Sequence, residues 1–267
     1  MHLTADDHPH SIKAYLGAVF FYIGFILSVF IYSCVVLLAS PFLPIKSRFP
    51  IMAHWAVFIT AWLRITCGVT YKIMGHIPKG PAVILSKHQS QWGTFYFQAL
   101  FPPQITVLKH SLIQIPIFGW ALNKMEPIVI DRSQRSTALQ QIIDQGTKRL
   151  KEGCRILIFP EGTRIRSGKN STLSRGGFVL AKESGFPIVP VAHNAGEFWH
   201  PDYLTKKPGE ITIVIGEPIE TQSRSIEELM EAVREWMQNK MYEISTVEKQ
   251  AQSKIQLPEV ITMNKNY

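Results

Sequence analysis

The feature that most constrains this chain is a long apolar segment near its N-terminus. No charged side chain occurs between Lys13 and Lys46, and residues 14–38 are mainly Phe, Ile, Val, Leu and Tyr. About 20 such residues are enough for a helix to cross the hydrocarbon core of a bilayer. A signal peptide has a shorter apolar region and a better cleavage site than Ala39-Ser40-Pro41. A buried core helix would usually show a polar face, so we expect membrane insertion.

The charged residues on either side of this segment predict its orientation. Asp6, Asp7 and Lys13 precede it, whereas Lys46 and Arg48 follow it. Loops on the cytoplasmic side of a membrane carry an excess of Lys and Arg. We therefore expect the C-terminal body of the chain to face the cytoplasm.

A second apolar stretch, Ile51–Leu63, ends just before Arg64. It is shorter than the roughly 17 residues that a helix needs to span a bilayer. An interfacial or re-entrant helix is therefore expected. Residues 1–66 are interpreted as one membrane-associated helical region.

The net charge limits which classes of partner are expected, and the cysteines limit the expected redox compartment. The formal net charge is +8 and the pI is about 9.4, which fits nucleic acid, an anionic membrane or a phosphorylated substrate. The apolar N-terminal segment favours a membrane over nucleic acid. Cys34, Cys67 and Cys154 have no CxxC spacing, which argues against a disulfide framework and against structural zinc. A reducing compartment is expected.

From about residue 70 onward, short β-branched runs alternate with helix-like stretches. The expected strands are Ala82–Leu85, Ile105–Leu108, Ile128–Ile130, Ile156–Phe159, Ile188–Val191 and Ile211–Ile215. Helical spacing of apolar residues predicts helices over Ser136–Leu150 and Gly176–Ser184. This alternation predicts an α/β domain over residues 67–247, with a mostly parallel mixed sheet flanked by helices.

The C-terminal part of this domain predicts one more helix. Ser225 and Glu228 have the spacing of a capping box. Apolar residues then recur at helical spacing from Ile226 to Met241, which predicts an amphipathic helix whose apolar face packs on the core. Residues 248–267 are polar without periodicity, so we expect a flexible tail.

Two polar segments directly follow expected strands, where α/β folds place their sites. One is Lys87-His88-Gln89-Ser90-Gln91-Trp92, and the other is Phe159-Pro160-Glu161-Gly162-Thr163-Arg164. The glycine frees backbone N–H groups and the arginine offers a forked cation, which suits a phosphate monoester. Taken separately, the histidine is more often a structural residue, and the second segment is compatible with an ordinary turn carrying a surface ion pair.

Seen together, the two segments resemble the family of lysophosphatidate and glycerol-3-phosphate acyltransferases. That family pairs a His-x4-Asp/Glu box with an FPEGTR-type box some seventy residues later, and residues 159–164 match the second box fully. Three further blocks are similar and occur in the family's order. They are Gly119 followed by Ile130-Asp131-Arg132, Arg175-Gly176-Gly177, and Ile188-Val189-Pro190-Val191. The resemblance covers roughly residues 70 to 220.

The resemblance implies an activity and a set of site residues. The reaction would move a fatty acyl group from acyl-CoA or acyl carrier protein to the sn-2 hydroxyl of 1-acylglycerol-3-phosphate, giving phosphatidate. His88 would be the catalytic base, and no metal or redox cofactor would be needed. The residues that would bind the acceptor phosphate or shape its pocket are Arg132, Glu161, Gly162, Thr163 and Arg164. The setting would be a bacterial inner membrane, with lipid substrates and no nucleic acid.

One position departs from the family pattern. Gly93 stands where the family carries the acid of its first box. That acid holds the imidazole in the correct tautomer and stabilises its cation, and losing the equivalent carboxylate of a serine protease costs about 10⁴ in turnover. The enzyme is therefore slow, or another group such as Thr94 or a water that it holds orients His88, or the chain is an impaired phospholipid-binding protein. A different lysophospholipid acceptor also stays open.

Other motifs do not fit. Gly162–Lys169 is similar to a Walker loop, but its glycines are one residue too far apart and Asn170 replaces the hydroxyl residue. No HExxH or comparable cluster occurs among the nine histidines, so no metal site is expected. The chain also has no G-x-S-x-G elbow, which weighs against a serine hydrolase.

Overall fold

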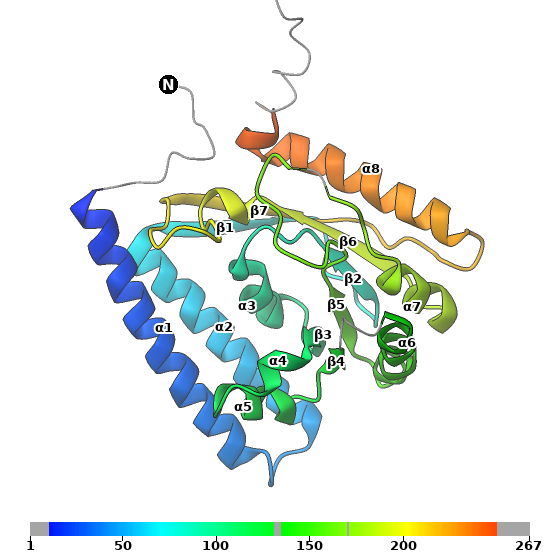
Figure 1. The fold of residues 1–267 in the computed structure, drawn as a ribbon, viewed down its shortest axis with the longest axis horizontal. Coiled ribbons are helices and arrows are strands. Elements are labelled where there is room, and N and C mark those ends of the chain that lie inside the picture. Colours follow the sequence, from blue (N-terminus) through cyan, green and yellow to red (C-terminus); the bar gives the residue numbers. More distant parts are fainter. Residues whose placement is uncertain (1–10, 131–134, 170, 250–267) are drawn as a thin grey trace, which may run out of the picture.

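The computed structural model describes residues 11–130, 135–169 and 171–249. In this part of the chain, seven strands form one sheet in the order β1-β7-β6-β2-β5-β3-β4 (Figure 1). The strands are β1 (Val69–Met74), β2 (Val83–Ser86), β3 (Gln104–Lys109), β4 (Ile128–Ile130), β5 (Arg155–Ile158), β6 (Ile188–His193) and β7 (Gly209–Ile215). Neighbouring strands are parallel except for β6 and β7. The expected mostly parallel mixed sheet is confirmed.

Alternate residues of the central strands point to opposite faces of the sheet. Val83 and Leu85 of β2 belong to one apolar cluster, whereas Ile84 belongs to another. Ile156 and Leu157 of β5 divide in the same way. Both faces are therefore apolar and need a cover, as in other parallel sheets.

Helices cover both faces of the sheet (Figure 1). One cluster contains residues of α6 (Arg135–Lys151), α7 (Gly176–Ser184) and α8 (Ile226–Ile244), and the other contains residues of α2 (Ile45–Cys67) and α3 (Gln91–Leu100). Two short helices, α4 (His110–Ile113) and α5 (Phe118–Lys124), lie between β3 and β4 in the chain. The 3-10 helix η1 (Ala195–Glu197) follows β6. The loops after β2 and β5 lie on the side of the sheet where its parallel strands have their carboxyl ends.

The expected elements agree closely with the structure where burial imposes a periodic pattern. The helix expected over Gly176–Ser184 coincides with α7, and α6 extends the expected Ser136–Leu150 by one residue at each end. The sequence pattern does not predict β1, because most of its side chains are exposed at the edge of the sheet and lack alternation. It also misses α3, whose first residues belong to the site segment.

α1 (Ile12–Ala39) is the apolar segment that we expected to enter a membrane. It is 28 residues long and apolar enough to cross one. Large apolar side chains on its outer face, such as Leu16, Phe20 and Leu27, are 54–57% exposed. A core helix would bury such side chains, so this exposed apolar face fits contact with lipid better than the alternative of a core helix.

α2 is longer than the apolar stretch Ile51–Leu63 that predicted it. It has 23 residues and is also long and apolar enough to cross a membrane. The expectation that this helix is too short to span was therefore wrong, because the helix begins before the apolar run, in turns that contain Lys46 and Arg48.

α1 and α2 pack against each other through polar contacts in an apolar interface. The indole N–H of Trp55 donates to the hydroxyl of Ser28 at 3.2 Å, and that of Trp62 donates to the carbonyl of Phe20 at 3.2 Å. In lipid, such bonds have no water to compete with them. The two helices thus form one unit at the side of the sheet (Figure 1).

α8 begins as the sequence predicts. Ser225 and Glu228 form both bonds of the capping box, and Leu229, Val233 and Met237 of the apolar stripe are buried. This confirms the interpretation of the stripe as core packing. Most of the expected flexible tail, from residue 250 onward, lies outside the described residues. The boundaries assigned to the membrane region, body and tail stay predictions.

Candidate active site

Two loops meet at the carboxyl edge of the sheet. One follows β2 and carries Lys87 and His88, and the other follows β5 and carries residues 159–164. β2 and β5 are parallel neighbours, so their carboxyl ends lie at the same edge. The main-chain N–H of Ile165 donates to the carbonyl of His88 at 2.8 Å, which joins the two loops directly.

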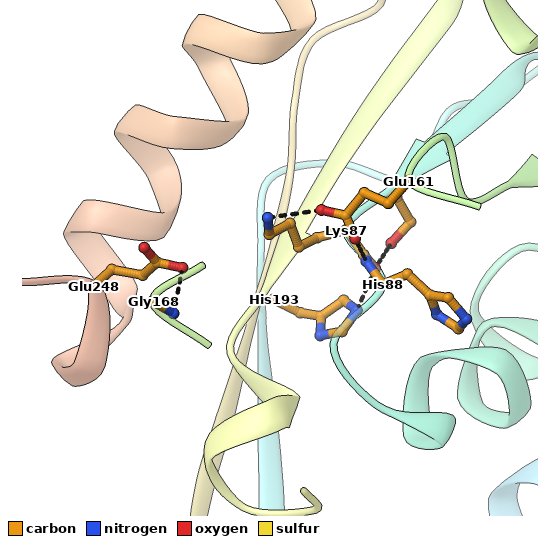
Figure 2. A network of polar contacts seen from close by, with 7 residues as sticks. Lys87, His88, Glu161, Gly168, His193 and Glu248 are labelled. Atoms are coloured by element: carbon orange, nitrogen blue, oxygen red, sulfur yellow. Dashed lines mark hydrogen bonds and ion pairs between the residues drawn. The ribbon is translucent and has the colours of Figure 1, made fainter. Parts of the chain in front are cut away.

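The carboxylate of Glu161 forms a second connection between these loops (Figure 2). One oxygen accepts the main-chain N–H of His88 at 2.9 Å, and the other lies 2.7 Å from Lys87 Nζ. The side chains of Glu161 and Lys87 are 1% and 12% exposed, so water and salt screen the pair little. Glu161 therefore holds the segment that carries His88, and its expected part in shaping the phosphate pocket stays a prediction.

The imidazole of His88 lies against an aromatic ring of the neighbouring loop. Its centroid is 4.0 Å from that of Phe159, with an angle of 24° between the rings. Both side chains line a large cavity. The ring of His88 is thus confined on one face and has access to the cavity.

This cavity has a volume of about 1270 Å³, above the range of ordinary ligand pockets. The lining includes His88 and the basic side chains of Lys109, Arg164 and Arg175, of which Arg175 also pairs with Glu227. Most of the remaining wall is apolar and includes Leu112, Ile115, Phe118, Leu122, Met125 and Ile142. The wall of the cavity therefore combines basic side chains with a larger apolar part.

The membrane-associated helices also contribute to this wall. Phe25 and Val29 of α1 and Met52 and Trp55 of α2 line the cavity. The same two helices expose apolar side chains on their outer surface. The exposed apolar side chains and the cavity lining thus belong to the same helix pair.

The structure brings only part of the expected phosphate site together. Gly162 and Arg164 line the cavity, whereas Thr163 is exposed and is not among the lining residues. Gly162 has φ +72°, a conformation that side chains rarely adopt, and its N–H closes a turn to the carbonyl of Phe159 at 3.0 Å. Arg132 lies outside the described residues.

Gly93 is buried in the first turn of α3, three residues after the N-cap Ser90. A Cβ atom at this position would lie 3.1 Å from Nε2 of His193 and 3.2 Å from the ring of Phe97. Position 93 therefore faces His193 closely. Thr94, the alternative partner for His88, lines the cavity together with His88.

His193 is a polar residue at this site that the sequence does not single out. It ends β6, its side chain is fully buried, and its Nε2 lies 2.9 Å from the carbonyl of Lys87 (Figure 2). The residue follows an apolar strand and belongs to no motif that we recognised. Only the pairing of β6 with β2 brings it beside the His88 segment.

The residues that the structure describes contain no group of three or more His, Cys, Asp or Glu side chains that could hold a metal ion.

Comparison with known proteins identifies the class of this fold and site. The family model "Acyltransferase" matches residues 68–194. The 1-acyl-sn-glycerol-3-phosphate acyltransferase of Pseudomonas aeruginosa is 41% identical over 239 residues, which cover 87% of this chain and 93% of that protein. The enzyme of the same name from Saccharomyces cerevisiae is 32% identical, over 72% of this chain and 68% of that protein. The chain belongs to the 1-acyl-sn-glycerol-3-phosphate acyltransferase family.

A solved structure supports the fold. The crystal structure of the 1-acyl-sn-glycerophosphate acyltransferase PlsC from Thermotoga maritima superimposes with a TM-score of 0.73. The superposition covers 89% of this chain and all of the other, at 22% sequence identity. The arrangement of helices and sheet is therefore shared.

The buried ion pair predicts a specific pattern of stability. Glu161→Gln leaves one acceptor oxygen for two donors and removes the negative charge that pairs with the Lys87 ammonium, at a cost on the order of 3 kcal/mol in the free energy of unfolding. Combining it with Lys87→Met should recover part of the loss, because no buried charge is then unpaired. Chemical denaturation in detergent measures both variants.

Glu231→Gln is the matched control, since its ion pair with Arg234 is exposed to solvent. That change should cost less than about 1 kcal/mol. An equal loss in Glu161→Gln and Glu231→Gln would contradict the assignment of Glu161 as a buried anchor.

Proposed function

We propose that this chain transfers a fatty acyl group from a thioester donor to the sn-2 hydroxyl of 1-acylglycerol-3-phosphate, giving phosphatidate. The observation that carries the proposal is the cavity, whose lining combines His88 and Arg164 with mainly apolar side chains. An acyl chain needs the apolar part, a phosphate needs the cation, and a hydroxyl needs a base. The names of the relatives agree with this acceptor.

The reaction requires two proton transfers, one from the acceptor hydroxyl to His88 and one from His88 to the leaving thiolate. His88 takes the proton of the sn-2 hydroxyl as that oxygen attacks the thioester carbonyl. When the C–S bond breaks, the thiolate leaves and receives the proton from the imidazolium. The thioester is already activated, so the proposal needs no metal or redox cofactor. Either acyl-CoA or acyl carrier protein fits as donor.

The acceptor phosphate is assigned to the basic part of the cavity wall. Arg164 lines the cavity and has no ion-pair partner among the described residues, so its guanidinium is available to bind a phosphate with two parallel bonds. The family resemblance implies that Arg132 binds this phosphate as well. Gly162 allows the turn that directs this loop toward the cavity. Thr163 stays a proposal by resemblance alone.

The membrane is the expected source of the acceptor. A single acyl chain gains about 0.8 kcal/mol per buried CH₂ group, so a lysolipid resides mainly in the bilayer. The outer surfaces of α1 and α2 suit that bilayer, and their inner surfaces line the cavity. We place the protein at a bacterial inner membrane with its α/β body on the cytoplasmic side, where the net charge of +8 favours anionic lipid.

The rival proposal is a phospholipid-binding protein that has lost catalysis. Gly93 favours it, because the carboxylate expected beside His88 is missing. Another lysophospholipid acceptor would use the same cavity with a different headgroup. The three experiments below separate these alternatives.

His88→Ala should abolish acyl transfer to lysophosphatidate, with a loss of at least about 100-fold in turnover, because a general base contributes that much or more. Release of free thiol from acyl-CoA, measured in detergent or in nanodiscs, follows the reaction. His76→Ala is the control, since His76 is exposed after β1 at the edge of the sheet. Unchanged transfer by His88→Ala would sink the mechanism.

Arg164→Ala should raise the KM for lysophosphatidate about 10- to 100-fold, because it removes charge-assisted hydrogen bonds to the phosphate. Arg166→Ala is the matched control, since Arg166 is an exposed arginine that pairs with Asp202. Transfer to 1-acylglycerol, which has no phosphate, should not change in Arg164→Ala. An equal effect on both acceptors would show that Arg164 does not bind the phosphate.

Gly93→Glu should raise turnover, because it restores the carboxylate that the family pattern carries at this position, and its Cβ requires Nε2 of His193, 3.1 Å away, to move by a few tenths of an ångström. A glutamate three residues after Ser90 also fits a capping box. We expect a gain of at least about tenfold, with about 10⁴ as the upper limit set by triad enzymes. Parallel assays of both proteins measure it.

Equal and substantial rates would mean that a group such as Thr94 already replaces the acid. Inactivity of both proteins would favour the lipid-binding rival or a different acceptor, and an acylation screen over several lysophospholipids distinguishes these two cases.

A further inference from the structure

The peptide bond between Lys87 and His88 is held at both of its polar ends (Figure 2). Its N–H donates to Glu161 Oε2 at 2.9 Å, and its carbonyl lies 2.9 Å from His193 Nε2. Glu161 follows β5 and His193 ends β6, so the two partners come from the strands on either side of β2. One peptide plane is therefore fixed from both neighbouring strands.

The hydrogen bonds of His193 define its tautomer. The main-chain N–H of Ala195 donates to its Nδ1 at 3.3 Å, so Nδ1 is an acceptor. The proton of a neutral imidazole then lies on Nε2, which donates to the carbonyl of Lys87. Complete burial lowers the pKa of His193 to about 4, so the ring is neutral and keeps this tautomer at physiological pH.

We propose that His193 is a positioning residue for the transfer reaction, because it fixes the peptide plane from which the imidazole of His88 projects. The proposal rests on the function assigned to His88 above. A misplacement of about 1 Å at a reacting group can cost 100-fold in rate. A donor that holds the plane acts on turnover without touching either substrate.

The glycine at position 93 makes this support more important. The family acid would hold the ring of His88 directly, and Gly93 provides no such group. The two hydrogen bonds to the Lys87–His88 peptide and the ring contact to Phe159 both contribute to the orientation of His88. His193 also occupies the space toward which a side chain at position 93 would point, at 3.1 Å from its Cβ.

A purely structural role is the alternative. His193 is fully buried and lies near the rings of Trp92 and Phe97, so any change there affects packing. A structural role predicts that lost stability and lost activity follow each other. A positioning role predicts that turnover falls in the fully folded protein while substrate binding is retained.

The test compares two substitutions of His193. His193→Gln keeps an N–H donor at about the position of Nε2, whereas His193→Leu keeps the approximate volume and removes the donor. We expect His193→Leu to lower kcat about 10- to 100-fold, with KM for lysophosphatidate within about twofold of wild type. His193→Gln should retain kcat within about threefold. Unfolding temperature and folded fraction are measured for each.

His200→Leu is the matched control. His200 is also a buried histidine whose Nδ1 accepts a main-chain N–H two residues further on, from Asp202 at 3.2 Å. It lies further along the chain, after η1. It is not one of the two residues that hold the Lys87–His88 peptide, and it does not line the cavity. We expect its kcat to stay within about twofold of wild type even where its unfolding temperature falls.

A second measurement does not depend on activity. In protein with ¹⁵N-labelled histidine, the His88 signal is assigned as the one lost in His88→Ala. His193→Leu should shift or broaden that signal and His193→Gln should not, and the His193 signal itself should report a neutral ring protonated on Nε2.

The outcomes separate the two proposals. Wild-type kcat in His193→Leu, or an equal loss in His193→Gln, would overturn the positioning role while the acyltransferase function stands. A wild-type protein without any acyl transfer would overturn the proposed function. In that case, an unchanged His88 signal in His193→Leu would still refute the positioning role of His193, and a shifted signal would support it.

Discussion

The site depends on one buried carboxylate. Glu161 accepts the N–H of His88 and pairs with Lys87 across the boundary between two parallel strands. Neither loop has regular secondary structure at this point, so the ladder of the sheet no longer fixes them. A charge that is removed from water must satisfy its acceptors inside the protein. This requirement gives two irregular loops a defined relation, and the position of His88 follows from it.

Burial explains which parts of the fold the sequence predicts. Strands with two buried faces, such as β2 and β5, are short apolar runs between turn residues, and α7 and α8 carry apolar stripes with clear ends. β1 is an exposed edge strand and shows no such pattern. The start of α2 was missed because its first turns are polar. Sequence periodicity records contact with the core, so elements without that contact escape it.

The same reasoning separates the predictable and the unpredictable residues of the site. His88 and Phe159–Arg164 follow strands directly and match a family pattern, so the sequence identifies them. His193 has the same chemistry as any other buried histidine, and only strand order brings it to Lys87. The two partners of Glu161 could not be predicted from the sequence either. A carboxylate in a turn looks available for a ligand until its two partners are known.

The two membrane-associated helices connect location with specificity. Their outer surface is apolar and exposed, and their inner surface carries Phe25 and Trp55 into the cavity wall. A helix pair that only anchored the body would need no contact with the cavity. Under the proposed function, a lysolipid held by lipid on one side of these helices reaches His88 on the other without entering water. The same two helices then form both the membrane anchor and part of the substrate cavity, so a change in their packing alters both.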